Sequence, residues 1–175
     1  MIDFKKCCIS FFILAIIILL IVFGNKSSTQ TEYLRLHIRA NSNTAIDQNI
    51  KYEIKDLVVE YLTPKVSKCY SKSDAKKMLN ENLSGINRVI DEFLAQKGFN
   101  YSSSVQILSE NFPTRVYEDV TLEAGIYDAL IINLGSGTGD NWWCVVYPPL
   151  CFTDTKNVVY RSLILDIIEK FKNKN

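Results

Sequence analysis

The chain has 175 residues, with 20 basic side chains (Lys and Arg) against 19 acidic ones and a formal net charge of +1. This balance lacks the basic surface of a nucleic-acid-binding protein, so we expect no nucleic-acid partner, and it argues against electrostatic attachment to anionic lipid. Residues 27–175 are enough for a single domain with a hydrophobic core.

The N-terminus is dominated by an apolar run from Cys7 to Gly24. As a helix rising about 1.5 Å per residue, it would extend roughly 27 Å, close to the hydrocarbon thickness of a bilayer. Two lysines precede it, which predicts a cytoplasmic N-terminus at 1–6, a transmembrane helix at 7–24 and an exported remainder. A cleaved signal peptide is the alternative, although no A-x-A-like site follows the run. We therefore expect a single-pass protein of the cell membrane, or a secreted one if the run is cleaved.

Residues 25–32 are polar and aperiodic and predict a tether, after which an exported domain would occupy residues 33–175. Apolar and polar side chains alternate at 33–40, which predicts a half-buried strand. One face of this strand would be buried, and the opposite face would carry His37 and Arg39.

Two helices are predicted next, each with one apolar stripe. The first covers residues 45–63, because Thr44 and Asp47 are spaced as a capping box and Pro64 would end the helix. The second covers residues 73–97.

The centre of the chain changes to an alternating pattern that predicts strands. These are expected near 105–112, at 115–120, at 126–134 and at 142–147. The glycine-rich segment 135–140 would join the last two as an antiparallel hairpin, because it lacks the pattern of a phosphate-binding loop. A third helix at 155–172 completes an α+β domain, with three α-helices packed on an antiparallel β-sheet and one N-terminal transmembrane helix before them.

Trp142 and Trp143 are the two tryptophans of the chain, and they lie next to Cys144, with Cys151 shortly after. Adjacent strand residues point to opposite faces, so one tryptophan can be packed in the core while the other forms an interface anchor or packs beneath the cysteine loop. Export favours a disulfide between Cys144 and Cys151, with Cys69 left over.

The same residues leave a catalytic alternative open. His37, the single histidine, could activate the thiol of Cys144 or Cys151 in an exported thiol hydrolase. A disulfide would consume that thiol, and no nucleophile motif surrounds either cysteine. One histidine and scattered cysteines also lack the spacing of a metal site, so we expect neither a metal nor a cofactor.

Several segments of the sequence together resemble a known family. They are Leu34–Ser42 with Asp47, Gln48 and Lys51; Phe112–Tyr117 with Ala124–Tyr127; Asn141–Val145; and Pro148–Phe152. In this order they resemble the stage II sporulation protein R family, and the similarity extends from Leu34 to Phe152.

The resemblance implies a non-enzymatic, exported intercellular signal of endospore formation, without a small-molecule substrate. Such a protein is made in the forespore and activates a membrane-embedded aspartic protease of the mother cell, stage II sporulation protein GA. That protease processes the precursor of the early mother-cell sigma factor. Exposed-face polarity and motif density select six candidate partner-binding residues: His37, Arg39, Asn41, Asn141, Trp142 and Trp143. A thiol hydrolase and a structural envelope protein remain the alternatives.

Overall fold

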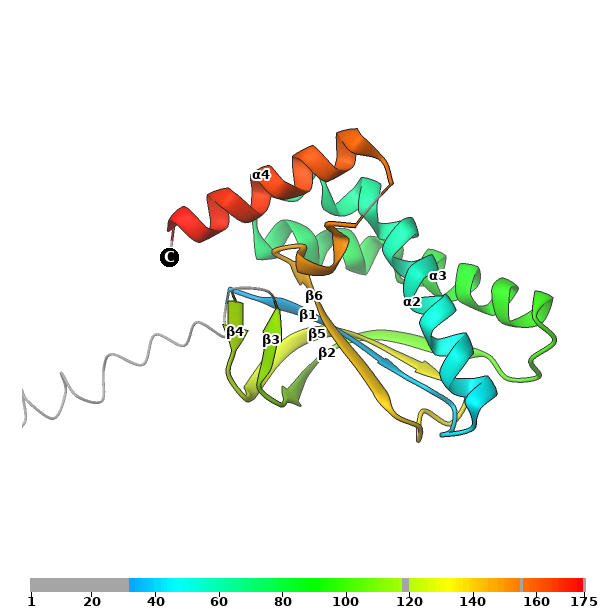
Figure 1. The fold of residues 1–175 in the computed structure, drawn as a ribbon. Helices are drawn as coiled ribbons and strands as arrows, with labels where there is room; N and C mark the ends of the chain where they lie inside the picture. The colour runs from blue at the N-terminus through cyan, green and yellow to red at the C-terminus, as the bar shows by residue number, and fades with distance from the viewer. Residues whose placement is uncertain (1–31, 118–119, 155, 175) are drawn as a thin grey trace, which may run out of the picture.

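The computed structural model describes residues 32–117, 120–154 and 156–174, which form a helical layer above a sheet (Figure 1). Its strands are β1 (Leu34–Arg39), β2 (Ser103–Phe112), β3 (Arg115–Tyr117), β4 (Val120–Leu122), β5 (Gly125–Leu134) and β6 (Asn141–Tyr147). Its helices are α2 (Ala45–Val66), α3 (Lys72–Gln96) and α4 (Val158–Lys174), with a short 3-10 helix, η2, at Leu150–Phe152. For these residues the predicted α+β class with three packed α-helices is confirmed.

The predicted cytoplasmic stretch (1–6), the predicted transmembrane helix (7–24) and all but the last residue of the predicted tether (25–32) lie outside the described residues. Within the described part of the chain, no helix combines the length and the apolarity needed to span a bilayer. The export of the domain therefore stays a prediction.

Four strands form one mixed sheet in the order β2-β5-β1-β6, with β1 parallel to β5 and antiparallel to β6. The predicted antiparallel pairing is found between β2 and β5 and between β1 and β6, whereas the β1–β5 pairing makes the sheet mixed. The predicted β5–β6 hairpin is wrong. β1 lies between these two strands, because the 135–140 loop crosses over the turn that follows β1 instead of closing a tight hairpin. The two segments are hydrogen-bonded, with Asn43 Oδ1 accepting from the backbone N–H of Asp140 at 2.6 Å.

The strand predicted at 115–120 is two short strands. β3 and β4 pair with each other in a separate two-stranded sheet, with Val116 opposite Thr121. This hairpin lies below one end of the main sheet, away from the helices (Figure 1).

The helix starts follow the local signals of the sequence. Thr44 and Ser71 cap α2 and α3, and each side chain accepts from a backbone N–H in the first turn. α2 continues past its predicted end, since Pro64 lies inside its last turn. A proline removes only one backbone donor, and the Thr63 hydroxyl adds a bond to the Val59 carbonyl there, at 2.7 Å.

The main core lies between the helices and one face of the sheet. Leu34, Leu36 and Ile38 point from β1 into this core and are fully buried, as their alternation predicted. Burial of such a side chain contributes roughly 1.5–3 kcal/mol. This core therefore fixes which face of β1 is left for its polar residues.

Candidate functional site

The face of the sheet away from the helices carries the polar side chains of β1, and it is also covered. Arg35 is 0% and His37 is 4% exposed, so the prediction of a half-buried strand is wrong. The reason is that the end of β2 and the β3–β4 hairpin fold over this face. A second, smaller core forms there from Phe112, Tyr127, Ala129 and Ile131, with Trp143 packed against it.

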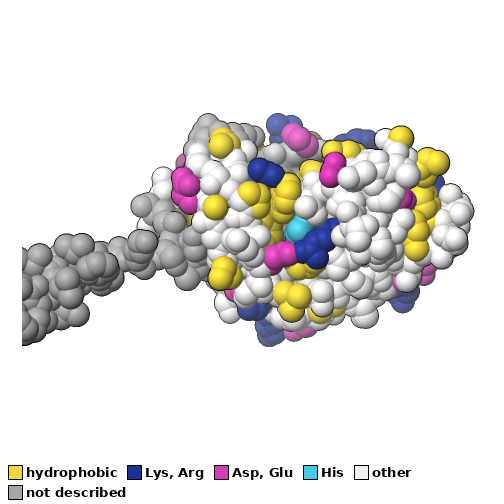
Figure 2. Space-filling view, turned by 90° about the horizontal axis from the view of Figure 1, so that it is seen from below, with side chains coloured by type: hydrophobic (Ala, Val, Ile, Leu, Met, Phe, Trp, Pro, Cys, Tyr) yellow, Lys and Arg dark blue, Asp and Glu magenta, His cyan; other side chains and the backbone are white. Residues whose placement is uncertain are grey.

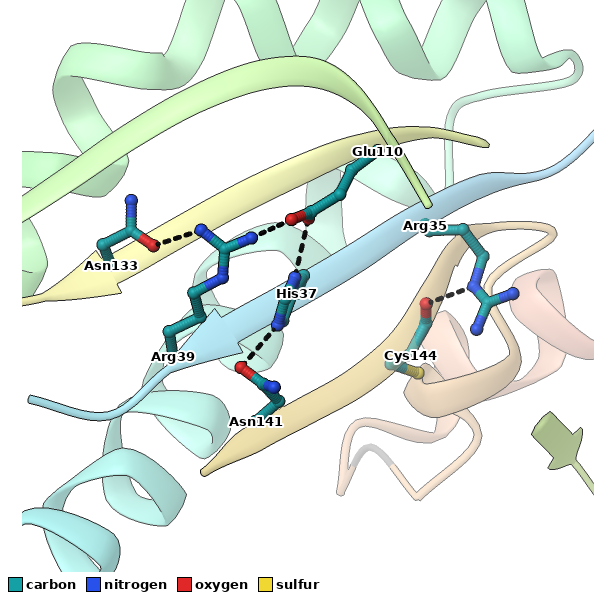
Figure 3. Close-up of polar contacts among 7 residues, drawn as sticks. All are labelled: Arg35, His37, Arg39, Glu110, Asn133, Asn141 and Cys144. Atoms are coloured by element: carbon teal, nitrogen blue, oxygen red, sulfur yellow. Dashed lines mark hydrogen bonds and ion pairs between the residues drawn. The ribbon is translucent and has the colours of Figure 1, made fainter. Parts of the chain in front are cut away.

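His37 lies at the centre of a polar cluster on this face (Figure 3). Its Nδ1 is 2.8 Å from Oε2 of Glu110, and its Nε2 is 2.8 Å from Oδ1 of Asn141. The imidazole stacks on Trp143, with ring centroids 5.4 Å apart, and meets the edge of Phe112 at 5.7 Å. These contacts bring together residues of β1, β2 and β6.

Arg39 completes this cluster. One of its guanidinium nitrogens forms an ion pair with Glu110, and the other donates to Asn133 Oδ1 at 3.2 Å. Glu110 therefore binds both His37 and Arg39, and the side chains of Glu110 and Arg39 are 26% and 29% exposed. Figure 2 shows the histidine at the bottom of a hollow with an acidic and a basic side chain beside it. We call the side chains of His37, Arg39, Glu110, Asn141 and Trp143 the His37 hollow.

The protonation state of His37 follows from its surroundings. Burial, reinforced by the charges of Arg39 and Arg35, lowers the pKa of His37 to about 4, and the hydrogen bond to Asn141 offsets only part of this. The carboxylate of Glu110 does not reverse the direction, since it is already paired with Arg39. His37 is thus neutral at pH 7 and carries one N–H. Both ring nitrogens face an acceptor oxygen, Nδ1 that of Glu110 and Nε2 that of Asn141, so the neutral ring donates its one N–H to one of these two oxygens.

A buried arginine borders the hollow. Arg35 donates from Nε to the Cys144 carbonyl at 3.2 Å and from Nη2 to the Tyr117 hydroxyl at 3.0 Å. Its guanidinium lies 4.5 Å from the ring centre of Phe112 and 4.9 Å from that of Tyr127. Nη1 has no hydrogen-bond partner among the described residues. Burial lowers the pKa of Arg35, although Tyr117 partly compensates.

A second arginine reaches the hollow from the hairpin. The guanidinium of Arg115, on β3, lies 4.2 Å from the ring centre of Trp143. It donates to the backbone carbonyl of Thr114 at 3.2 Å. Arg35 and Arg115 thus hold the hairpin against the sheet through side chains.

Four of the six predicted contact residues, His37, Arg39, Asn141 and Trp143, come together in the hollow. Trp142 does not, because it points to the opposite face and packs against the helical core. Asn41 lies in the turn after β1, where Oδ1 accepts from the backbone N–H of Ser136 and Nδ2 donates to Asp47, both at 2.9 Å. A contact role for any of the six stays a prediction.

Sequence reasoning missed three residues of this region: Arg35, Glu110 and Arg115. The sequence could have indicated Arg35, because it lies two positions before His37 and therefore points to the same face of the strand. No such pattern indicates Glu110, since it is 73 residues from His37 and reaches it only because the end of β2 folds over the sheet.

The cysteines lie on the other side of the sheet. Cys144 and Cys151 form a disulfide with their Cα atoms 6.2 Å apart, which is the pair that the sequence favoured, and Cys69 is free and buried. Cys144 belongs to the helical core, whereas His37 faces the hollow. The structure does not bring together the thiol and imidazole that a hydrolase would need. In the part of the chain that is described, no three His, Cys, Asp or Glu side chains are grouped to hold a metal ion.

These features define an α+β domain with an internal disulfide and with an aromatic and charged hollow on the helix-free face of its mixed sheet. Residues 30–157 match the family model described as Stage II sporulation protein R (spore_II_R), and the chain belongs to this family. The resemblance seen in its motifs is thus confirmed, and it supports a role in sporulation.

One relative is Stage II sporulation protein R of Bacillus subtilis (strain 168), which is 40% identical over 124 residues. The alignment covers 71% of this chain and 55% of the relative, so the chain spans about half the length of that protein. No solved structure matches the chain.

Proposed function

We propose that this protein is an exported signalling protein of endospore formation. Made in the forespore, it binds the membrane-embedded aspartic protease of the mother cell, stage II sporulation protein GA. Binding promotes processing of the precursor of the early mother-cell sigma factor. Family membership supports the sporulation role, and the His37 hollow supports a role in binding.

The observation that carries the proposal is the composition of the hollow. Trp143 and Arg39 are partly exposed residues of the types that dominate binding energy at protein interfaces. Glu110 and Asn141 hold the His37 ring between them, each through one ring nitrogen at 2.8 Å, and this fixes the floor of the hollow. Mechanistically, binding activates a protease only if the hollow has higher affinity for the active form than for the inactive one.

The test is made in sporulating cells by deleting the gene and following processing of the sigma-factor precursor. We expect processing to fail on deletion and to return with the wild-type gene. Trp143→Ala should weaken binding by about 2 kcal/mol, as expected for a central aromatic residue of an interface. Tyr70→Ala is the matched control, because that aromatic side chain is 70% exposed and lies outside the hollow.

Protein levels must be measured in the same cells, since Trp143 also packs against the second core. Loss of processing at normal protein level supports the hollow as the contact surface. Normal processing without the gene would refute the signalling function and favour the structural envelope alternative.

A further inference from the structure

Among the residues that the structure describes, the arginines around the His37 hollow outnumber the carboxylates that contact them. Three guanidinium groups, those of Arg35, Arg39 and Arg115, lie on this side of the sheet or against it. Among the described residues, Glu110 is the one carboxylate in contact with them, and it pairs with Arg39. Oε1 of Glu110 accepts from Arg39 and Oε2 contacts His37, so each of its oxygens already has one partner within the hollow.

Two cations are therefore left without a carboxylate among the described residues. Arg35 is fully buried, and its Nη1 lacks a partner there. Arg115 is close enough to Arg35 for its charge to help lower the pKa of Arg35, after the larger effect of burial. A buried cation without a counterion is costly, so the described part of this region favours an incoming anion.

Arg115 is the group placed to receive that anion. Its guanidinium lies over the ring of Trp143 and donates one bond to a neighbouring backbone carbonyl. A guanidinium packed against an aromatic ring keeps N–H groups available at its edge, and the fork of two such groups matches a carboxylate. Arg115 is partly exposed on the hairpin, whereas Arg35 is sealed beneath it.

We propose that Arg115, stacked on Trp143, binds a side-chain carboxylate on an acidic segment of the partner protein. This rests on the proposed function, in which that partner is the mother-cell protease. The segment presents Asp or Glu to the Arg115 fork and an apolar neighbour to the Trp143 ring. The field of Arg35 beneath the hairpin strengthens the attraction.

The binding test uses the full-length protein and fluorescently labelled peptides that cover the exported segments of the protease, read by fluorescence anisotropy. Each acidic peptide is paired with a version in which Asn and Gln replace Asp and Glu. We expect at least one acidic peptide to bind and its amide version to bind about 10- to 100-fold more weakly, the usual value of a charge-assisted hydrogen bond. Affinity should also fall as salt rises.

Substitutions of Arg115 test whether the preference for the acidic peptide depends on this residue. Arg115→Gln should weaken the acidic peptide about 10- to 100-fold, and Arg115→Lys should retain part of the affinity because it keeps the charge without the fork. Arg88→Gln is the matched control, since Arg88 is an exposed arginine on α3 outside the hollow. Thermal unfolding of each variant shows whether the hairpin substitution has disturbed the fold.

In sporulating cells, Arg115→Glu should reduce precursor processing, and Lys in place of the critical acidic residue of the protease should restore it. Equal binding of acidic and amide peptides, or unchanged binding by Arg115→Gln, would overturn the inference. If processing needs the gene but is indifferent to Arg115, the inference fails while the proposed function stands. If processing does not need the gene, the proposed function fails first.

Discussion

His37 should destabilise the fold as the pH falls from 7 to 4. Its ordinary pKa is 6.5, and burial followed by the charges of Arg39 and Arg35 lowers it to about 4 in the folded state. Above pH 6.5 the imidazole is neutral in both the folded and the unfolded state, so it does not change the free energy of unfolding with pH. Between these values only the unfolded chain takes up the proton, so stability is lost with falling pH. The full loss, reached below about pH 4, corresponds to about 3 kcal/mol at about 1.4 kcal/mol per pH unit.

The single histidine of the chain makes the measurement direct. Its imidazole resonances, followed by NMR in the full-length protein, should titrate with a midpoint near 4. Denaturant unfolding at pH 7 and pH 4 should show that the wild type loses about 3 kcal/mol more than His37→Gln, whose amide can still donate to Glu110. Subtracting the loss measured for the variant cancels the contribution of the carboxylates, which titrate in the same pH range in both proteins.

One result would refute this reasoning. A titration midpoint at or above 6.5 would mean that the fold favours the imidazolium, held between Glu110 and the oxygen of Asn141 as two acceptors. Glu110 would then outweigh burial and the charges of Arg39 and Arg35, and no stability would be lost through His37 as the pH falls to 4.

Three further predictions concern stability, each measured by chemical unfolding of the full-length protein. Replacing Cys144 and Cys151 with alanine should cost about 2 kcal/mol, the loop-closure value for a short loop, and the wild type in reducing buffer should match this variant. Gly139→Ala should cost about 1–3 kcal/mol, because its added methyl would meet the backbone carbonyl of Ser42. Lys51→Met should cost about 1–3 kcal/mol, since buried Lys51 donates to the backbone carbonyl of Asp140 at 3.0 Å, which would keep only the longer bond from the Ala40 N–H at 3.4 Å. A smaller loss in any of these variants would show that the site relaxes around the change.

The helices could be predicted because their signals are local. Thr44 and Ser71 lie directly before periodic apolar segments, and both cap the helices that follow. The end of α2 was harder to predict, because a proline in the last turn removes a single hydrogen bond and side-chain donors nearby can offset it. Such compensation depends on neighbours that no short sequence window defines.

The strand order could not be predicted in the same way. The alternation in β1 correctly put Leu36 and His37 on opposite faces, and the adjacent Trp142 and Trp143 likewise separate to the two faces. The position of β1 between β5 and β6 depends on pairings with strands about a hundred residues later in the chain. The same limit hid Glu110, whose contacts with His37 and Arg39 exist only after the end of β2 folds over the sheet.

The motif residues that do not reach the hollow have a structural task that the hollow depends on. Asn41 and Lys51 bind the 135–140 loop, through the backbone N–H of Ser136 and the carbonyl of Asp140, and Asn43, just after the first motif, accepts from the N–H of Asp140. These bonds join the end of β1 to the start of β6, next to the pairing of Arg39 with Asn141.

A slip of one residue in this pairing would turn every side chain of β1 to the other face, and His37 would leave Trp143 for the helical core. Leu36 and Ile38 oppose that slip through burial, and the bonded turns oppose it at the strand end. The first and last of the motif segments therefore depend on each other. The turn after β1 fixes the register of β1 against β6, and this register places His37 beside Trp143 in the hollow. Asn41 then affects function through the position of β1, and Trp143 affects it through contact.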